Sequence, residues 1–101
     1  MAVHELKDVQ MTRSGESVDF VHGYLVESEL EGKKLFDMTL KNVVQYEMFR
    51  TSQMDKEPVQ VTFTTLDDQT GKAEMEVRTV NRRDPDDNIV ELLTMDNIEF
   101  H

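Results

Sequence analysis

The chain has 101 residues, no cysteine and a formal net charge of −10, from 21 acidic and 11 basic side chains. This length fits one domain with one core, and the missing thiols exclude disulfides, cysteine nucleophiles and thiolate metal sites and fit a reducing compartment. The negative charge would repel phosphate backbones and anionic lipid, so we expect neither direct nucleic-acid binding nor membrane association. Because the start of the chain lacks a signal-peptide pattern and no apolar run could span a bilayer, we expect a cytoplasmic protein.

Apolar side chains at every second position predict antiparallel strands along most of the chain. In residues 3–11 the apolar side chains lie three apart, which fits a helical turn or an irregular first strand, and we predict a strand. The alternation over 18–26 predicts a second strand with Phe20, His22 and Tyr24 on one face, and we expect His22 to be partly buried. A third strand is predicted around residues 36–40.

Residues 40–50 are ambiguous. Leu40, Val43, Val44 and Met48 nearly form a helical stripe, whereas the two valines and Tyr46 favour a β-strand. We predict a strand here.

The second half of the chain alternates more clearly. Strands are predicted at 59–65, at 73–79 and at 89–93, and we expect Ile98 and Phe100 to pack back onto the core after a turn. Polar turns rich in glycine, proline, asparagine and aspartate separate the strands at residues 14–17, 31–33, 55–58, 67–71 and 83–88.

These elements predict a mainly β fold, namely one small single-domain antiparallel barrel or sandwich of six to seven strands over residues 1–101. Met38, Met48 and Met75 fall on the apolar faces and are assigned to the core. Met54 stands in a polar stretch, where exposure would make it an adaptable contact side chain.

No residue pattern indicates catalysis or metal binding. The histidines have no metal-binding spacing, and the acidic segment 84–88 lacks the glycine and the distal glutamate of an EF-hand loop, so we predict a plain hairpin turn there. GxSxG, P-loop and GxGxxG motifs do not occur. We therefore expect no catalytic residue, no metal and no cofactor, and a protein that is not an enzyme.

The segment 37–42 reads DMTLKN, and it precedes a strand at 59–63, a strand at 73–80 and a last strand at 89–95. This order of elements, from about residue 18 onward, resembles a PilZ domain. That family is a bacterial six-stranded barrel that commonly senses cyclic di-GMP.

The segment 37–42 falls where the PilZ family has a D/N-x-S-x-x-G motif. Asp37 matches it, Thr39 keeps the hydroxyl, and Asn42 is a residue that tolerates positive φ. The resemblance implies that these three residues bind a ligand, with Arg13 as the candidate for a phosphate. Because Arg13 stands alone where the family has an RxxxR pair, the resemblance implies a divergent member that has lost cyclic di-GMP and kept a protein-binding role.

We therefore predict a non-enzymatic binding or regulatory module that acts through protein–protein contacts, with a basic protein as a candidate partner. One alternative is an acidic phage or host-interaction protein that blocks a nucleic-acid-binding enzyme by mimicry, which carboxylates aligned on one face would favour. Another is a small-barrel enzyme, which a deep pocket with two convergent titratable groups would favour. A homodimer paired through strand edges also stays open.

Overall fold

The computed structural model describes residues 2–84, 87–98 and 100, and these form six strands and one helix. The predicted strands near 3–11, 36–40, 59–65, 73–79 and 89–93 are confirmed. The elements in chain order are β1 (Ala2–Met11), β2 (His22–Leu30), β3 (Lys33–Lys41), α1 (Tyr46–Asp55), β4 (Val59–Thr65), β5 (Thr70–Asp84) and β6 (Asp87–Thr94).

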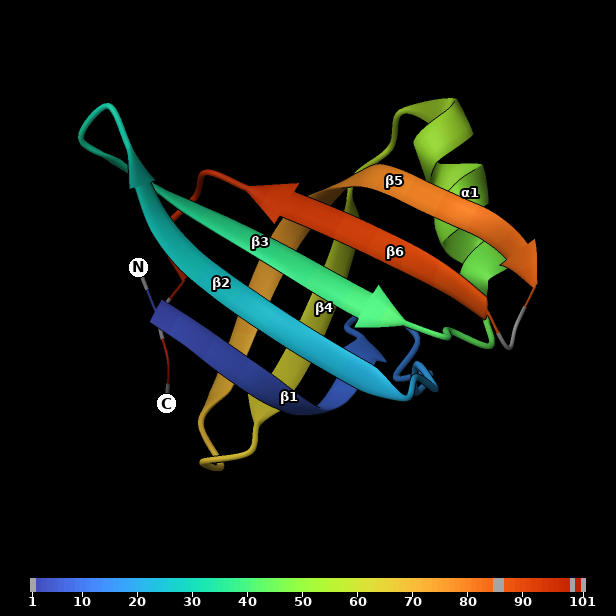
Figure 1. Ribbon diagram of the computed structural model, residues 1–101, viewed down its shortest axis with the longest axis horizontal. Helices are drawn as coiled ribbons and strands as arrows, with labels where there is room; N and C mark the ends of the chain where they lie inside the picture. Colours follow the sequence, from blue (N-terminus) through green and yellow to red (C-terminus); the bar gives the residue numbers. More distant parts are fainter. Residues whose placement is uncertain (1, 85–86, 99, 101) are drawn as a thin grey trace.

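The strands form a closed antiparallel barrel in the order β1-β2-β3-β6-β5-β4, so the fold is a barrel and not a sandwich (Figure 1). β1 closes it by pairing with β2 through residues 2–5 and then with β4 through residues 6–11, with an irregularity between Leu6 and Asp8. β5 also changes neighbour, because its first part pairs with β4 and its later part with β6. In Figure 1, β2, β3 and β6 face the viewer and β4 lies behind them.

The pleat of the strands sends one set of side chains into the barrel. Phe36, Met38 and Leu40 of β3 are fully buried, and they alternate with half-buried outward residues. Met75 is buried as predicted, while Met48 is half-buried against the core. Met54 is 71% exposed, as its polar surroundings indicated.

The predicted face of β2 is wrong. The strand begins at His22, which is exposed and not partly buried, and Leu25 is the residue that reaches the core. Tyr24 and Val26 lie on the outer side of the barrel. Apolar residues stand on both sides of this strand, so the alternation alone could not identify the inner one. Gly23 points inward, where a Cβ would lie 2.9 Å from the Leu40 side chain.

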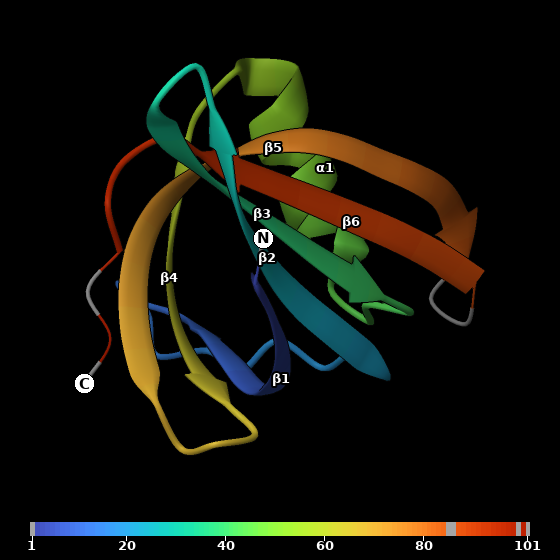
Figure 2. The ribbon, with the colours of Figure 1, turned by 60° about the vertical axis from the view of Figure 1, so that its left-hand side comes forward.

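The strand predicted over 40–50 is also wrong, because α1 occupies most of that segment. Phe49 is the buried residue of the helix, and α1 packs against β5 (Figure 2). The Gln53 side-chain amide donates a hydrogen bond of 2.9 Å to the Arg78 carbonyl. Lys56, at the C-terminal end of α1, has φ 54°, and its backbone N–H donates to carbonyl oxygens of the last helical turn. This left-handed residue, followed closely by Pro58, is a helix stop.

Asn88, at the start of β6, ties the connection between β3 and α1 to the sheet. Its buried Oδ1 accepts a hydrogen bond from the Val43 N–H at 2.8 Å, and its Nδ2 donates to the Val43 carbonyl at 2.9 Å. Asn42 adds a second link, because its N–H donates to the Asn88 carbonyl at 2.9 Å. The segment that leads into α1 therefore has a fixed path.

After β6 the chain turns back as predicted. Ile98 is buried, and the Phe100 ring lies 5.9 Å from the Phe63 ring in an edge-on arrangement. The predicted turn at 84–88 includes residues 85 and 86, which lie outside the described residues, as does His101. Within the described part of the chain, no helix is long and apolar enough to cross a membrane.

Replacing Asn88 by alanine should lower the free energy of unfolding by about 2 to 4 kcal/mol, because two buried backbone groups of Val43 lose their partners. Asn88→Asp should destabilise at least as much, since it removes the donor and adds a buried charge. Urea unfolding followed by circular dichroism measures both changes. The exposed Asn81→Ala is the control, and an equal loss in that variant would contradict the role of the Asn88 side chain.

Candidate functional site

The four residues predicted to bind a ligand fall in three different places. Asp37 and Thr39 lie on β3 and point outward from the barrel. Asn42 follows the end of β3 and has φ 58, the positive φ that its place in the motif suggested. Arg13 lies in the loop between β1 and β2. The structure brings Asp37 and Thr39 onto one surface and leaves Arg13 apart from them.

Asn42 has a structural use. Its Oδ1 accepts a hydrogen bond from the Asn88 N–H at 3.3 Å, and its own N–H donates to the Asn88 carbonyl. The side chain is therefore engaged within the protein. A ligand at Asp37 and Thr39 would find the amide oxygen of Asn42 already bonded to Asn88.

Asp37 lies in the middle of what we call the outer face, formed by outward side chains of β2, β3 and β6. The pairing of the strands makes Val26, Asp37 and Leu93 cross-strand neighbours. Val3 of β1, which is 57% exposed, is paired with Val26 and extends the apolar row. The exposed Lys33 and Lys41 lie at the two ends of the β3 part of this face. The half-buried residues of the outer face are Tyr24, Val26, Ser28, Leu35, Asp37, Thr39, Ile89, Glu91 and Leu93.

The carboxylate of Asp37 makes no hydrogen bond within the described part of the chain. Its Oδ1 is buried and has no hydrogen-bond partner among the described residues. A carboxylate oxygen shielded from water and left without a donor destabilises the fold. Its apolar neighbours Val26 and Leu93 offer no donor from their side chains. Because the atom is closed to water in this position, a donor from another molecule can bond to it only once the carboxylate turns toward the surface.

The outer face continues into a hollow of about 340 Å³ at its edge, which we call the acidic hollow. Leu93 belongs to both, and Glu76 of β5 is its cross-strand neighbour. The hollow combines three carboxylates with an apolar wall. Its lining residues are Pro58, Glu74, Glu76, Leu93, Thr94, Met95 and Asp96.

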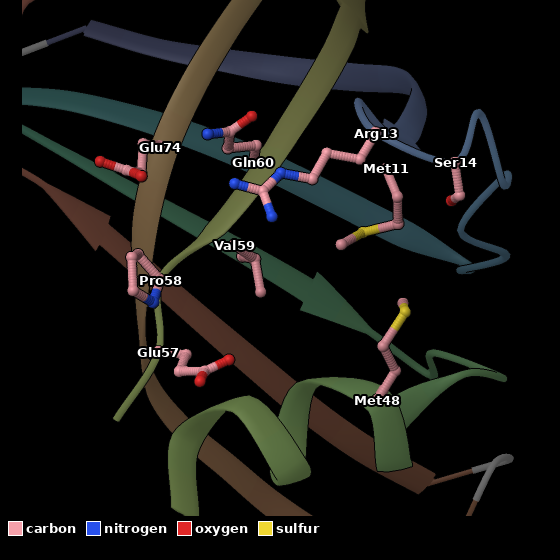
Figure 3. Close-up of a pocket in the computed structure, with 9 residues that line it drawn as sticks. All are labelled: Met11, Arg13, Ser14, Met48, Glu57, Pro58, Val59, Gln60 and Glu74. Atoms are coloured by element: carbon pink, nitrogen blue, oxygen red, sulfur yellow. The ribbon is translucent and has the colours of Figure 1, made fainter. Parts of the chain in front are cut away.

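Arg13 lines a separate cleft of about 440 Å³, which we call the Arg13 cleft, between the β1–β2 loop, β4 and α1 (Figure 3). Its volume falls within the range of small-molecule pockets. The loop is held by backbone hydrogen bonds, from the Met11 N–H to the Glu16 carbonyl and from the Thr12 N–H to the Gln60 carbonyl. The cleft is lined by Met11, Arg13, Ser14, Met48, Glu57, Pro58, Val59, Gln60 and Glu74.

The side chains of this cleft separate into an apolar side and a charged side. Figure 3 shows the thioethers of Met11 and Met48 pointing toward the same space, with Val59 beside it. The Arg13 guanidinium approaches from the loop, and the Glu57 carboxylate lies beyond Val59, near α1.

The sequence did not identify Met48 or Glu57 as site residues. Met48 was placed in a strand, and only the helix brings it opposite Met11. Glu57 lines the cleft because the chain leaves α1 at Lys56 and enters β4 at Val59. The helix stop around Lys56 and Pro58 was the signal that could have revealed this arrangement.

Replacing Asp37 by valine should raise the free energy of unfolding by about 1 kcal/mol, because a buried oxygen without a partner is exchanged for a β-branched side chain beside Val26 and Leu93. Urea unfolding measures the change. Glu74→Val is the matched control, since it makes the same exchange at an exposed position of β5. A gain in the control as large as that of Asp37→Val would show that the buried oxygen is not the cause.

Comparison with known proteins assigns no family to the chain. It matches no protein-family model, no curated protein and no solved structure. Among the described residues, no group of three or more histidine, aspartate or glutamate side chains is placed to hold a metal ion. A function has to be argued from the barrel and from the side chains on its surface.

Proposed function

We propose that this protein is a non-enzymatic binding module whose outer face docks a basic protein partner. The observation that carries the proposal is the buried Oδ1 of Asp37, which lacks a partner in the middle of an apolar row. A partner that draws the carboxylate toward the surface and donates an N–H to it would remove the cost of leaving this oxygen without a hydrogen bond.

The chemistry of the outer face favours lysine or arginine as the partner's central side chain. Such a side chain can place its aliphatic stem on Val26 and Leu93 while its charged end reaches Asp37. A second positive charge of the partner fits the acidic hollow, where Glu74 and Glu76 lie beside the apolar Leu93. The net charge of −10 also speeds the approach of a basic partner.

A second copy of the chain suits this surface less well. Two outer faces brought together would place four carboxylates, those of Asp37 and Glu91 in each copy, in one interface, and the net charge of −10 on each copy opposes their approach. A basic protein partner therefore fits the outer face better than a second copy of the chain.

The PilZ resemblance belongs to this proposal, as a divergent barrel that has lost cyclic di-GMP. The closed six-stranded barrel, the outward Asp37 and Thr39 and the positive φ of Asn42 support the likeness. The loss of the nucleotide is supported by Arg13, which lies in a separate cleft and cannot supply the second half of a phosphate site beside Asp37.

The two alternatives have less support. Acidic side chains occur on α1, in the loops and on each described strand other than β4. A nucleic-acid mimic would need its carboxylates in rows on one face. For an enzyme, the Glu57 and Glu74 carboxylates of the Arg13 cleft would have to converge. Figure 3 shows them pointing in different directions.

A random peptide library displayed on phage tests the proposal directly. Peptides selected on the immobilised protein should combine lysine or arginine with large apolar residues, and a synthetic copy should shift the amide resonances of Val26, Asp37 and Leu93. Asp37→Asn should weaken its binding about tenfold or more in calorimetry, because the charged hydrogen bond is lost. Asp55→Asn, an exposed change of the same charge on α1, is the control. Failure to select any peptide, or equal affinity in wild type and Asp37→Asn, would count against the proposal.

Cyclic di-GMP should leave the amide spectrum of residues 37–42 and of Arg13 unchanged up to millimolar concentration. The physical reason is that only one arginine is available and that it lies apart from Asp37. GMP serves as the control for nonspecific shifts. Saturable shifts centred on residues 37–42 would instead establish nucleotide binding and contradict the proposed loss.

A further inference from the structure

We infer that the Arg13 cleft is a binding site for a zwitterionic ligand with an apolar body, such as a short peptide with free termini or an apolar amino acid. The inference goes beyond the docking of a protein partner, because it concerns another surface of the barrel. The outer face is built from β2, β3 and β6, whereas the cleft is built from the β1–β2 loop, α1, β4 and β5. The cleft shares Pro58 and Glu74 with the acidic hollow but contains no residue of the outer face. Either proposal can fail while the other holds.

The cleft holds opposite charges that do not neutralise each other. Arg13 and Glu57 both line it, yet neither takes part in an ion pair within the described part of the chain, where the salt bridge is the one between Lys7 and Asp68. Arg13 presents a planar fork that matches a carboxylate, and Glu57 can accept a hydrogen bond from an ammonium group. A ligand that carries both groups would pair each charge without bringing a net charge of its own.

The space beside these charges is apolar and adaptable. Met11 and Met48 are half-buried, and Val59 is 5% exposed. Methionine side chains adjust to differently shaped apolar groups, so the site suits a class of side chains rather than one. The apolar body of the ligand would lie on these three residues.

Glu74, the second carboxylate of the cleft, disfavours a strongly anionic ligand. Glu57 and Glu74 both line the cleft with Arg13, so a phosphate dianion would gain one attraction and meet two repulsions. The expectation that Arg13 would bind a phosphate is therefore replaced by a single carboxylate balanced by an ammonium group.

The cleft is also prearranged. The loop that carries Arg13 is tied at both of its sides, by the Gly15 N–H to the Met11 carbonyl at 2.8 Å and by the Thr12 N–H to the Gln60 carbonyl at 2.9 Å. Gly15 has φ 73, which allows this tight return. A ligand would not need to order the loop, which lowers the entropic cost of binding.

The test is an amide NMR titration of the full chain with leucyl-leucine, N-acetyl-leucyl-leucine, leucyl-leucine amide and free leucine. Leucyl-leucine should give saturable shifts in residues 11–15, 48 and 57–60. Arg13→Gln should weaken leucyl-leucine about tenfold but leave leucyl-leucine amide unchanged, because that ligand has no carboxylate to lose. Glu57→Gln should likewise weaken leucyl-leucine and leave the N-acetyl form unchanged.

Arg78→Gln and Glu47→Gln are the matched controls, because both side chains are exposed and neither lines the cleft. Tighter binding of free leucine than of leucyl-leucine would identify an amino acid as the ligand and support the same chemistry. The absence of saturable shifts with every probe at millimolar concentration would overturn the inference. So would binding that Arg13→Gln and Glu57→Gln leave intact.

Discussion

The buried amide of Asn88 is the constraint on which the arrangement of this barrel depends. It bonds both the N–H and the carbonyl of Val43, which lies in the connection between β3 and α1. Because β3 ends there, the amide takes over the hydrogen bonds that a sheet would otherwise supply. From this point the chain leaves the barrel wall and begins α1. The position of Met48 in the Arg13 cleft follows from that path, although Met48 makes no hydrogen bond to Asn88.

Periodicity was sufficient to identify most strands but not to orient all of them. In β4 the polar and apolar sides are distinct, and the alternating apolar residues Val59, Val61 and Phe63 are the ones buried. In β2 both sides carry apolar residues, so the inner side had to be decided by contacts with neighbouring strands. The sequence could not contain that information locally. The apolar outer face and the wrong assignment of β2 therefore have the same physical origin.

The site was predictable to a similar, limited extent. Asp37 and Thr39 are two residues apart in a strand, which was enough to place them on the same side. Whether that side faced outward depended on the register with β2 and β6. The grouping of Arg13, Met48 and Glu57 in one cleft depends on α1. The sequence predicts a strand there because two valines and a tyrosine have high β-propensity. Local β-propensity there was overridden by the left-handed stop at Lys56 and by the packing of Phe49.

Closure of the barrel determines the kind of recognition that this surface can support. Each strand pairs with two others, although β1 and β5 do so along different stretches, so most of the main chain in the wall is paired and partners are recognised mainly through side chains. Side-chain recognition in a chain with 21 carboxylates is selective only where the surroundings distinguish one carboxylate from the others. Asp37 is distinguished by its buried oxygen in an apolar row, and Glu57 by the unpaired Arg13 in the same cleft. Solvated carboxylates elsewhere contribute to the long-range electrostatic field, which attracts cationic partners without selecting one over another.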